Sequence, residues 1–447
     1  MASAAEQLAA NLNFGVFSKA TELKKRLWFT LWALIVYRLG TYIPLPGINP
    51  HALQDLFRHN AGGILGMFDM LAGGALQRMT IFALNIMPYI SASIILQLMA
   101  TVSPSIEALK KEGEAGRKKI NQYTRYLTVI IAAMQAYGIS SGLEGMSSSV
   151  GPAVIAPGMF FRFTAVITLV GGTMFLMWLG EQITARGVGN GTSLIIFAGI
   201  VANLPRAVVG TLELGRTGAL SPLLILGLFV LAIGVVAIIV FVERAQRRIL
   251  VQYPKRQQGN KVYGGETSHL PLKVNTSGVI PPIFASSILL LPMTIAGFSA
   301  GRGPEWLTTI TTMLGRGHPL YLAMYSFLIA FFAFFYTAVV FNPVDTADNL
   351  KKYGGFIPGI RPGKNTADYL DYVLTRLTVL GAVYLVVLSV LPEILISRLA
   401  VPFYFGGTSL LIVVTVTMDT VAQIQSHLLA HQYEGLIKKA KLRGKRG

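Results

Sequence analysis

The sequence predicts an all-α polytopic membrane protein with ten transmembrane helices in two inverted five-helix halves. Hydrophobic residues make up 53% of the 447 residues. Charged residues make up only 13%, whereas soluble globular proteins carry about 25%. In addition, strongly basic loops alternate along the chain with loops that carry at most two basic residues. The chain contains no cysteine, which excludes disulfides, thiolate metal sites and cysteine nucleophiles.

Ten apolar segments have roughly the length that a helix needs to cross a hydrocarbon core. The basic stretches are residues 19–26, where the predicted cytoplasmic amino-terminal segment (1–22) meets the first apolar segment, the loops after the second, sixth and eighth segments, and the tail (428–447). The positive-inside rule therefore places both termini in the cytoplasm. The segments span residues 24–43, 76–101, 121–141, 160–181, 193–210, 221–242, 275–297, 318–341, 373–392 and 405–427.

Ten crossings divide into two halves of five helices. A repeat with an odd number of crossings reverses its orientation in the membrane, so the two halves would be inverted relative to each other. We expect residues 23–213 to form the first half and residues 214–427 to form the second. The second half carries two long basic loops, at 243–274 and 342–372.

The second apolar segment is not a plain lipid-facing span. It carries no charge from Met79 to Thr101, yet Pro88 lies in its middle. Ile86, Ile90, Ser93 and Gln97 follow helical spacing and would share one face. That face is apolar at its centre and polar toward its carboxyl end, which is typical of a funnel that narrows to a hydrophobic constriction. A helix–helix packing seam remains the alternative.

The seventh segment is interrupted in the same way, by Asn275, Ser277, Pro281 and Ser286 among others. It holds the corresponding place in the second half. A matched pair of broken spans indicates the functional seam of an inverted-repeat protein.

The stretch 61–74 is apolar, too short to span a bilayer, and bracketed by pairs of glycines that can act as hinges. It is either a re-entrant stopper or an interfacial helix.

The sequence lacks the residues that several functional classes of membrane protein require. The spans hold no acidic pair at mid-depth, which ion-coupled carriers need. No catalytic constellation or nucleotide-binding P-loop occurs, so we expect neither an enzyme nor a cofactor, and energy must come from a partner. The two long basic loops suit an anionic partner, although basic loops also simply satisfy the orientation rule.

Five stretches resemble bacterial SecY, the central channel subunit of the Sec protein translocon. Asn85 departs from the glycine expected at that position. The stretches are Ile81–Ile94, Gly180–Gly191, Asp345–Lys352, Gly359–Gly363 and Val401–Ile412.

The resemblance implies a protein-conducting channel of the bacterial inner membrane, with a pore between two halves and a lateral gate between the second and seventh helices. The implied partners are the small subunits SecE and SecG, the motor ATPase SecA, the ribosome, signal peptides, nascent chains and anionic lipids. It implies a pore ring of Ile86, Ile90, Ile196, Ile280 and Ile412; a plug including Gly63, Ile64, Leu65, Met67, Phe68, Met70 and Leu71; a gate including Asn85, Pro88, Ser93, Gln97, Asn275, Ser277, Pro281 and Ser286; and docking residues Lys255, Arg256, Arg361 and Lys364.

Overall fold

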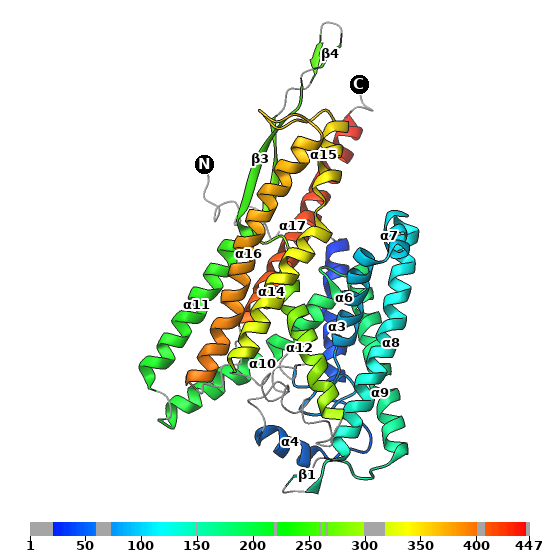
Figure 1. The fold of residues 1–447 in the computed structure, drawn as a ribbon, viewed down its shortest axis with the longest axis vertical. Coiled ribbons are helices and arrows are strands. Elements are labelled where there is room, and N and C mark those ends of the chain that lie inside the picture. Colours follow the sequence, from blue (N-terminus) through cyan, green and yellow to red (C-terminus); the bar gives the residue numbers. More distant parts are fainter. Residues whose placement is uncertain are drawn as a thin grey trace. The chain divides into compact units, whose positions relative to one another are not determined.

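A computed structural model of the chain is almost entirely helical in the residues that it describes (Figure 1). Among these residues, seven helices have the length and apolar composition to cross a membrane, and one bent pair would make an eighth. The predicted all-α membrane fold is confirmed, whereas the count of ten helices stays a prediction. The described residues are 21–59, 73–145, 147–148, 151–218, 221–254, 256–258, 261–263, 267–298, 318–399 and 407–443. The predicted plug residues 63–71 and Lys255 lie outside them.

The helices follow the apolar segments closely, and the strands form small antiparallel pairs outside the spans. The helices are α3 (Thr21–Gly40), α4 (Pro50–His59), α6 (Met87–Val102), α7 (Pro104–Lys111), α8 (Glu114–Glu144), α9 (Met159–Arg186), α10 (Gly191–Arg216), α11 (Pro222–Arg244), α12 (Ile280–Phe298), α14 (Pro319–Val340), α15 (Pro343–Lys352), α16 (Lys364–Leu399) and α17 (Gly407–Arg443). The strand pairs are β1 (Ser147–Ser148) with β2 (Gly151–Pro152), β3 (Gln246–Gln252) with β6 (Thr267–Lys273), and β4 (Arg256–Gln258) with β5 (Lys261–Tyr263).

The chain forms two compact units. The described residues up to Pro205, residues 294–298 and the chain from Val416 onward belong to the first unit. Residues 206–293 and the described residues from 318 to Thr415 belong to the second. The predicted assignment of 23–213 and 214–427 to two inverted repeats stays a prediction.

The prediction of one continuous helix over 76–101 is wrong. Residues 73–86 form turns apart from a bridge at Thr80, and α6 begins only at Met87. Pro88 therefore lies in the first turn of the helix rather than at its middle. Proline has no backbone N–H and clashes with the preceding turn inside a helix, but both costs vanish in the first turn. The chain then bends by 104° between α6 and α7.

The seventh segment is shortened for the same reason. Residues 274–279 form bends and turns, and α12 begins at Ile280. Pro281 and Pro282 fall in its first turn, where proline is tolerated. Asn275 and Ser277 thus precede the helix instead of lying on it.

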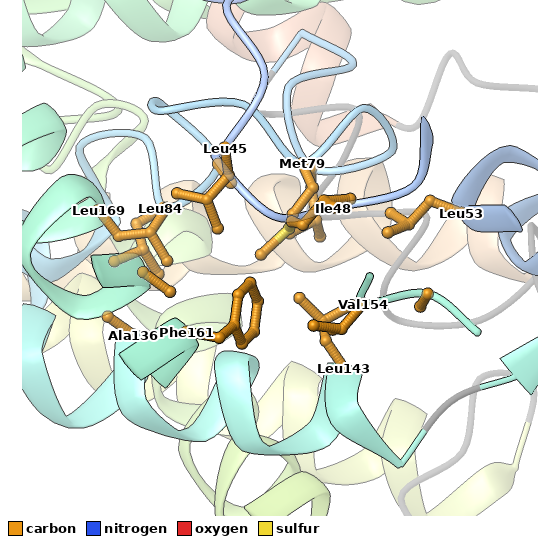
Figure 2. Close-up of a cluster of buried hydrophobic side chains, with 14 of the residues drawn as sticks. Leu45, Ile48, Leu53, Met79, Leu84, Ala136, Leu143, Val154, Phe161 and Leu169 are labelled. Carbon is orange, nitrogen blue, oxygen red and sulfur yellow. The ribbon is translucent and has the colours of Figure 1, made fainter. Parts of the chain in front are cut away.

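The first unit has an apolar core where irregular chain packs on two long helices (Figure 2). Leu45, Met79 and Leu84 come from turns, and Ala136 and Leu169 come from α8 and α9. Burying a large apolar side chain contributes about 1.5–3 kcal/mol. This core explains how residues 73–86 are held in place without helical hydrogen bonds.

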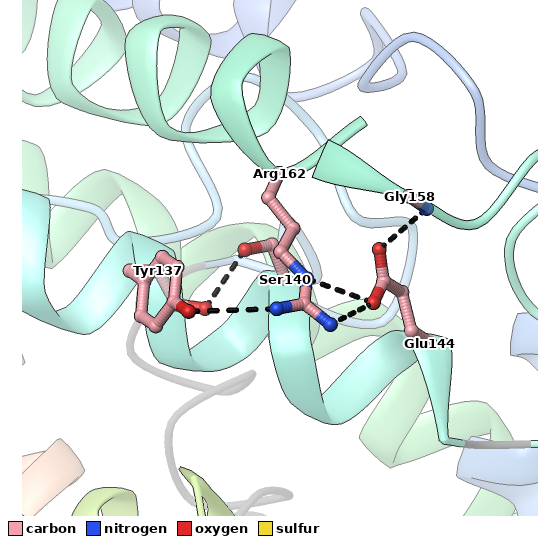
Figure 3. Close-up of polar contacts among 5 residues, drawn as sticks. All are labelled: Tyr137, Ser140, Glu144, Gly158 and Arg162. Atoms are coloured by element: carbon pink, nitrogen blue, oxygen red, sulfur yellow. Dashed lines mark hydrogen bonds and ion pairs between the residues drawn. The ribbon is translucent and has the colours of Figure 1, made fainter. Parts of the chain in front are cut away.

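An ion pair joins the ends of α8 and α9 (Figure 3). The Arg162 Nε and Nη2 groups donate to the Glu144 Oε2 atom, at 2.8 and 2.6 Å. The other oxygen, Oε1, accepts the backbone N–H of Gly158 at 2.9 Å. The short connection between the two helices is therefore held at both of its ends.

Candidate functional site

Three of the five predicted ring isoleucines lie in the first unit, and all three are buried. Ile86 is 0% exposed and stands directly before α6. Ile90 is 8% exposed and lies one turn later, with its N–H donating to the Ile86 carbonyl at 3.2 Å. Ile196, on α10, is 5% exposed. Ile86 and Ile90 therefore lie one above the other at the point where turns give way to helix.

The other two predicted ring residues belong to the second unit. Ile280 is partly buried at the first position of α12, and Ile412 is buried on α17. That all five side chains meet in one ring stays a prediction.

Asn85 has a backbone conformation that most residues avoid. Its φ is +49°, in the left-handed region, and its side chain is buried. Glycine occupies this region freely, and asparagine is among the few other residues that tolerate it. The structure therefore gives a reason both for the glycine that we expected and for the asparagine present here.

We predict that Asn85→Val destabilises the chain whereas Asn85→Gly does not. A β-branched residue in the left-handed region costs about 1–2 kcal/mol, and glycine has no such cost. Thermal unfolding of the two purified variants in detergent measures the difference. Equal melting temperatures would show that the backbone of residue 85 adopts another conformation.

Ser93 and Gln97, two of the predicted gate residues on α6, share a face, as their spacing indicated. The Gln97 side-chain amide donates to the Ser93 hydroxyl at 3.3 Å. On α12, the Ser286 hydroxyl donates to the Ile283 carbonyl at 2.9 Å, so that its polar group is satisfied within its own helix. Because α6 and α12 belong to different units, a gate between them remains a prediction.

Two loops that are distant in sequence, and that the sequence predicts to be cytoplasmic, form one folded platform in the second unit. Strands β3 and β6 pair over seven residues each, from Gln246 to Gln252 and from Thr267 to Lys273. The backbones of Gln252 and Phe356 exchange two hydrogen bonds of 2.9 Å, which attach the second loop to β3. A shared apolar cluster of Ile249, Val251, Leu272, Ile357 and Leu370 lies beneath.

The platform presents the predicted docking residues in defined positions. Arg361 is exposed, and its carbonyl accepts the Thr366 hydroxyl at 3.0 Å. Lys364 is exposed at the start of α16. Arg256 begins β4, whose partner β5 follows in the same hairpin. The basic side chains of Arg361 and Lys364 are thus exposed on a folded support.

Buried charge is absent from the side chains that the structure describes. The buried polar residues there are threonine, serine and asparagine. No group of three or more metal-ligating carboxylates or imidazoles occurs in the described residues.

Sequence reasoning missed an arginine cluster at the carboxyl end of α3. Arg38 donates to the Gly73 carbonyl at 2.8 Å and to the Tyr42 hydroxyl at 3.1 Å. The Arg78 guanidinium carbon lies 4.2 Å from the centre of the Tyr42 ring. The cluster holds the carboxyl end of the predicted plug segment, at Gly73. Only the pairing of basic and aromatic residues on either side of that segment could have indicated it.

Comparison with known proteins identifies the family. A family model described as SecY matches residues 80–421, which is most of the chain. The chain belongs to the SecY family. It is 58% identical over 429 residues to the protein translocase subunit SecY of Rickettsia conorii, covering 96% of this chain and 99% of that protein. It is also 58% identical over 424 residues to SecY of Escherichia coli K12, covering 95% of this chain and 96% of that protein.

Solved structures of SecY-type channels share the fold. One described as a protein-conducting channel superposes with a TM-score of 0.62 at 17% identity, covering 91% of this chain and 92% of that one. Sec61 in a canine ribosome–channel complex gives the same TM-score, identity and coverage. At such identities the likeness shows the fold alone.

Proposed function

We propose that this chain is the protein-conducting channel of a bacterial inner membrane, through which unfolded polypeptides cross and from which apolar segments leave sideways into the bilayer. The observation that carries the proposal is the identity with protein translocase subunits along nearly the whole chain. The apolar helices and the absence of buried charge among the described side chains support a passive path.

In this proposal Ile86, Ile90, Ile196, Ile280 and Ile412 form an isoleucine ring at the narrowest point. Branched apolar side chains offer neither hydrogen bonds nor charge to a passing chain. A constriction lined by them loses its water when it is unoccupied, which limits ion leakage. Residues 61–74 act as a plug that closes the resting pore.

The lateral gate lies between α6 and α12. A signal segment that enters there exposes its apolar side chains to lipid and gains about 25 cal/mol for each Å² of apolar surface removed from water. Because the segment binds only the parted state, it shifts the channel toward that state. Proline in the first turn of both helices keeps their preceding segments free of helical hydrogen bonds.

The platform built on β3 and β6 docks the partner that supplies the energy, which is the motor ATPase SecA or the ribosome. Its exposed basic residues suit the acidic or phosphate surfaces of such partners. Two solved structures of the same fold are described as ribosome complexes, one of canine Sec61 and one of the yeast Ssh1 complex. SecE, SecG and anionic lipids complete the assembly, both termini lie in the cytoplasm, and the chain itself performs no catalysis.

Reconstitution tests the proposal. The purified chain with its small subunits is placed in lipid vesicles with SecA, ATP and an unfolded secretory precursor. We expect the precursor to become protected from added protease only when its signal segment and ATP are present. Uptake of a small solute in place of precursor protection would instead identify a transporter.

A further inference from the structure

The chain that leads into α12 is tied down before the helix begins. We call residues 274–279 the lead-in segment. Asn275 and Ser277, within it, are 3% and 4% exposed. The backbone N–H of Val274 donates to the Ala245 carbonyl at 3.1 Å, directly after α11. The lead-in segment is therefore folded against its own unit.

A carboxylate holds the centre of this segment. The Asn275 Nδ2 group donates to the Glu243 Oε1 atom at 2.7 Å and to the Gly278 carbonyl at 3.1 Å. The Asn275 Oδ1 atom accepts the Ser277 hydroxyl at 3.0 Å. Because a carboxylate can only accept, the contact with Glu243 fixes which end of the amide faces it.

The stability of α11 alone does not explain why a glutamate stands at position 243. Glu243 lies in the last turn of that helix, which ends at Arg244. A negative charge in the last turn interacts unfavourably with the helix dipole. Hydrogen bonds to an ionised group are stronger than those between neutral groups. The bond to Asn275 therefore offsets a local cost and ties two elements together.

A second contact holds the lead-in segment from the side of α16. A Cβ atom built on Gly381 would lie 2.9 Å from the Val274 carbonyl oxygen and 3.5 Å from the Asn275 Cα atom. Only glycine allows this approach. Gly278, whose carbonyl accepts the Asn275 amide, has a φ of +62°, and a Cβ there would meet nothing within 4 Å. This left-handed turn, which we call the joint, is held by the anchor and leads into α12.

We propose that Glu243 is a positioning residue for the gate: through Asn275 it anchors the lead-in segment, and α12 moves about the joint at Gly278. This inference rests on the gate proposed above. Loss of the anchor frees the start of α12 and favours the open state of the gate.

Paired substitutions test the anchor in the full channel complex. Asn275→Asp places a carboxylate against Glu243 and removes the donor. Combining it with Glu243→Gln restores the bond between residues 243 and 275, because the glutamine amide then donates to the aspartate, whereas the bond to the Gly278 carbonyl stays lost. Asn349→Asp, at an exposed site on α15, adds the same charge elsewhere as a control. Gly381→Ala adds a methyl group on α16 that would collide with the Val274 carbonyl, and it changes no charge.

Hydrogen exchange of the backbone amides in residues 274–284 measures directly how firmly the anchor holds the lead-in segment. Loss of a hydrogen bond to a charged group speeds local opening by roughly tenfold or more. We expect that acceleration in Asn275→Asp and Gly381→Ala, slower exchange in the Glu243→Gln/Asn275→Asp pair than in Asn275→Asp alone, and no change in Asn349→Asp. Unchanged exchange in Asn275→Asp, or failure of the pair to restore protection, would overturn the anchor.

The ion conductance of the resting channel in vesicles tests whether the anchor also keeps the gate closed. We expect Asn275→Asp to leak and the paired variant to be tight. Faster exchange without a leak would overturn the link between this segment and the gate, while the anchor itself would stand. Precursor protection in the reconstitution experiment is measured separately, so failure of the channel function would be distinguished from failure of this inference.

Discussion

Replacing Ile86 and Ile90 together by serine raises the ion conductance of the resting channel by more than about tenfold. Exchanging a buried large apolar side chain for a small polar one lowers the cost of wetting by roughly 2 kcal/mol per residue. A change of about 1.4 kcal/mol is already tenfold in an equilibrium. The two positions are 0% and 8% exposed in the structure, so water is excluded from both.

A matched pair on α10 separates a pore effect from general destabilisation. Ile195 and Ile196 are neighbours, 0% and 5% exposed, but only Ile196 is assigned to the ring. We expect Ile196→Ser to increase the leak and Ile195→Ser to lower stability without doing so. Planar-bilayer recordings of the purified channel measure both. Equal leaks from the pair, or none from the Ile86 and Ile90 double variant, would contradict a seal made of these side chains.

Arg361→Glu blocks motor-driven export while leaving signal-directed membrane assembly much less affected. The side chain is exposed on a loop whose Gly359 and Gly363 have φ values of +81° and +106°. Reversing its charge does not disturb a buried contact of its own, and it places like charges against an acidic partner surface. Such opposition costs several kcal/mol across an interface, which is enough to lower partner binding by about a hundredfold or more.

The measurement compares SecA-driven precursor protection with insertion of a single-span protein in the same vesicles. Lys352→Glu is the control, because Lys352 is also exposed on the platform but has no assigned docking role. Normal export by Arg361→Glu, or an equal loss in Lys352→Glu, would show that docking does not depend on Arg361.

Hydropathy predicted most of the helices, because apolar length alone specifies a span. It failed over residues 76–86, which we predicted to be helical but which form turns apart from a bridge at Thr80. Hydropathy records side chains, whereas the start of α6 is decided by the missing N–H of Pro88 and by the left-handed backbone at Asn85. Both residues are visible in the sequence, but the position of the helix start depends on packing against the core shown in Figure 2.

The candidate site could be predicted only where it is local. Ser93 and Gln97 are close in sequence, and their shared face followed from helical spacing. The contact between Gln252 and Phe356 joins loops about a hundred residues apart, and no local pattern indicates it. The Glu144–Arg162 pair had a weak signal, since opposite charges stand at the two ends of a short connection. Glu243 and Asn275 gave no such signal, because asparagine is uncharged and the two residues are 32 positions apart.

Disulfide trapping of a chain in transit tests the passage beside Ile90 most directly. The natural chain has no cysteine, so one introduced by Ile90→Cys is unique. Leu169→Cys, at a core position that is 0% exposed, serves as the control. A precursor arrested halfway, with a single cysteine at the depth of the ring, should form a disulfide with residue 90 and none with residue 169. Absence of the bond at 90, or equal bonding at both positions, would contradict the account.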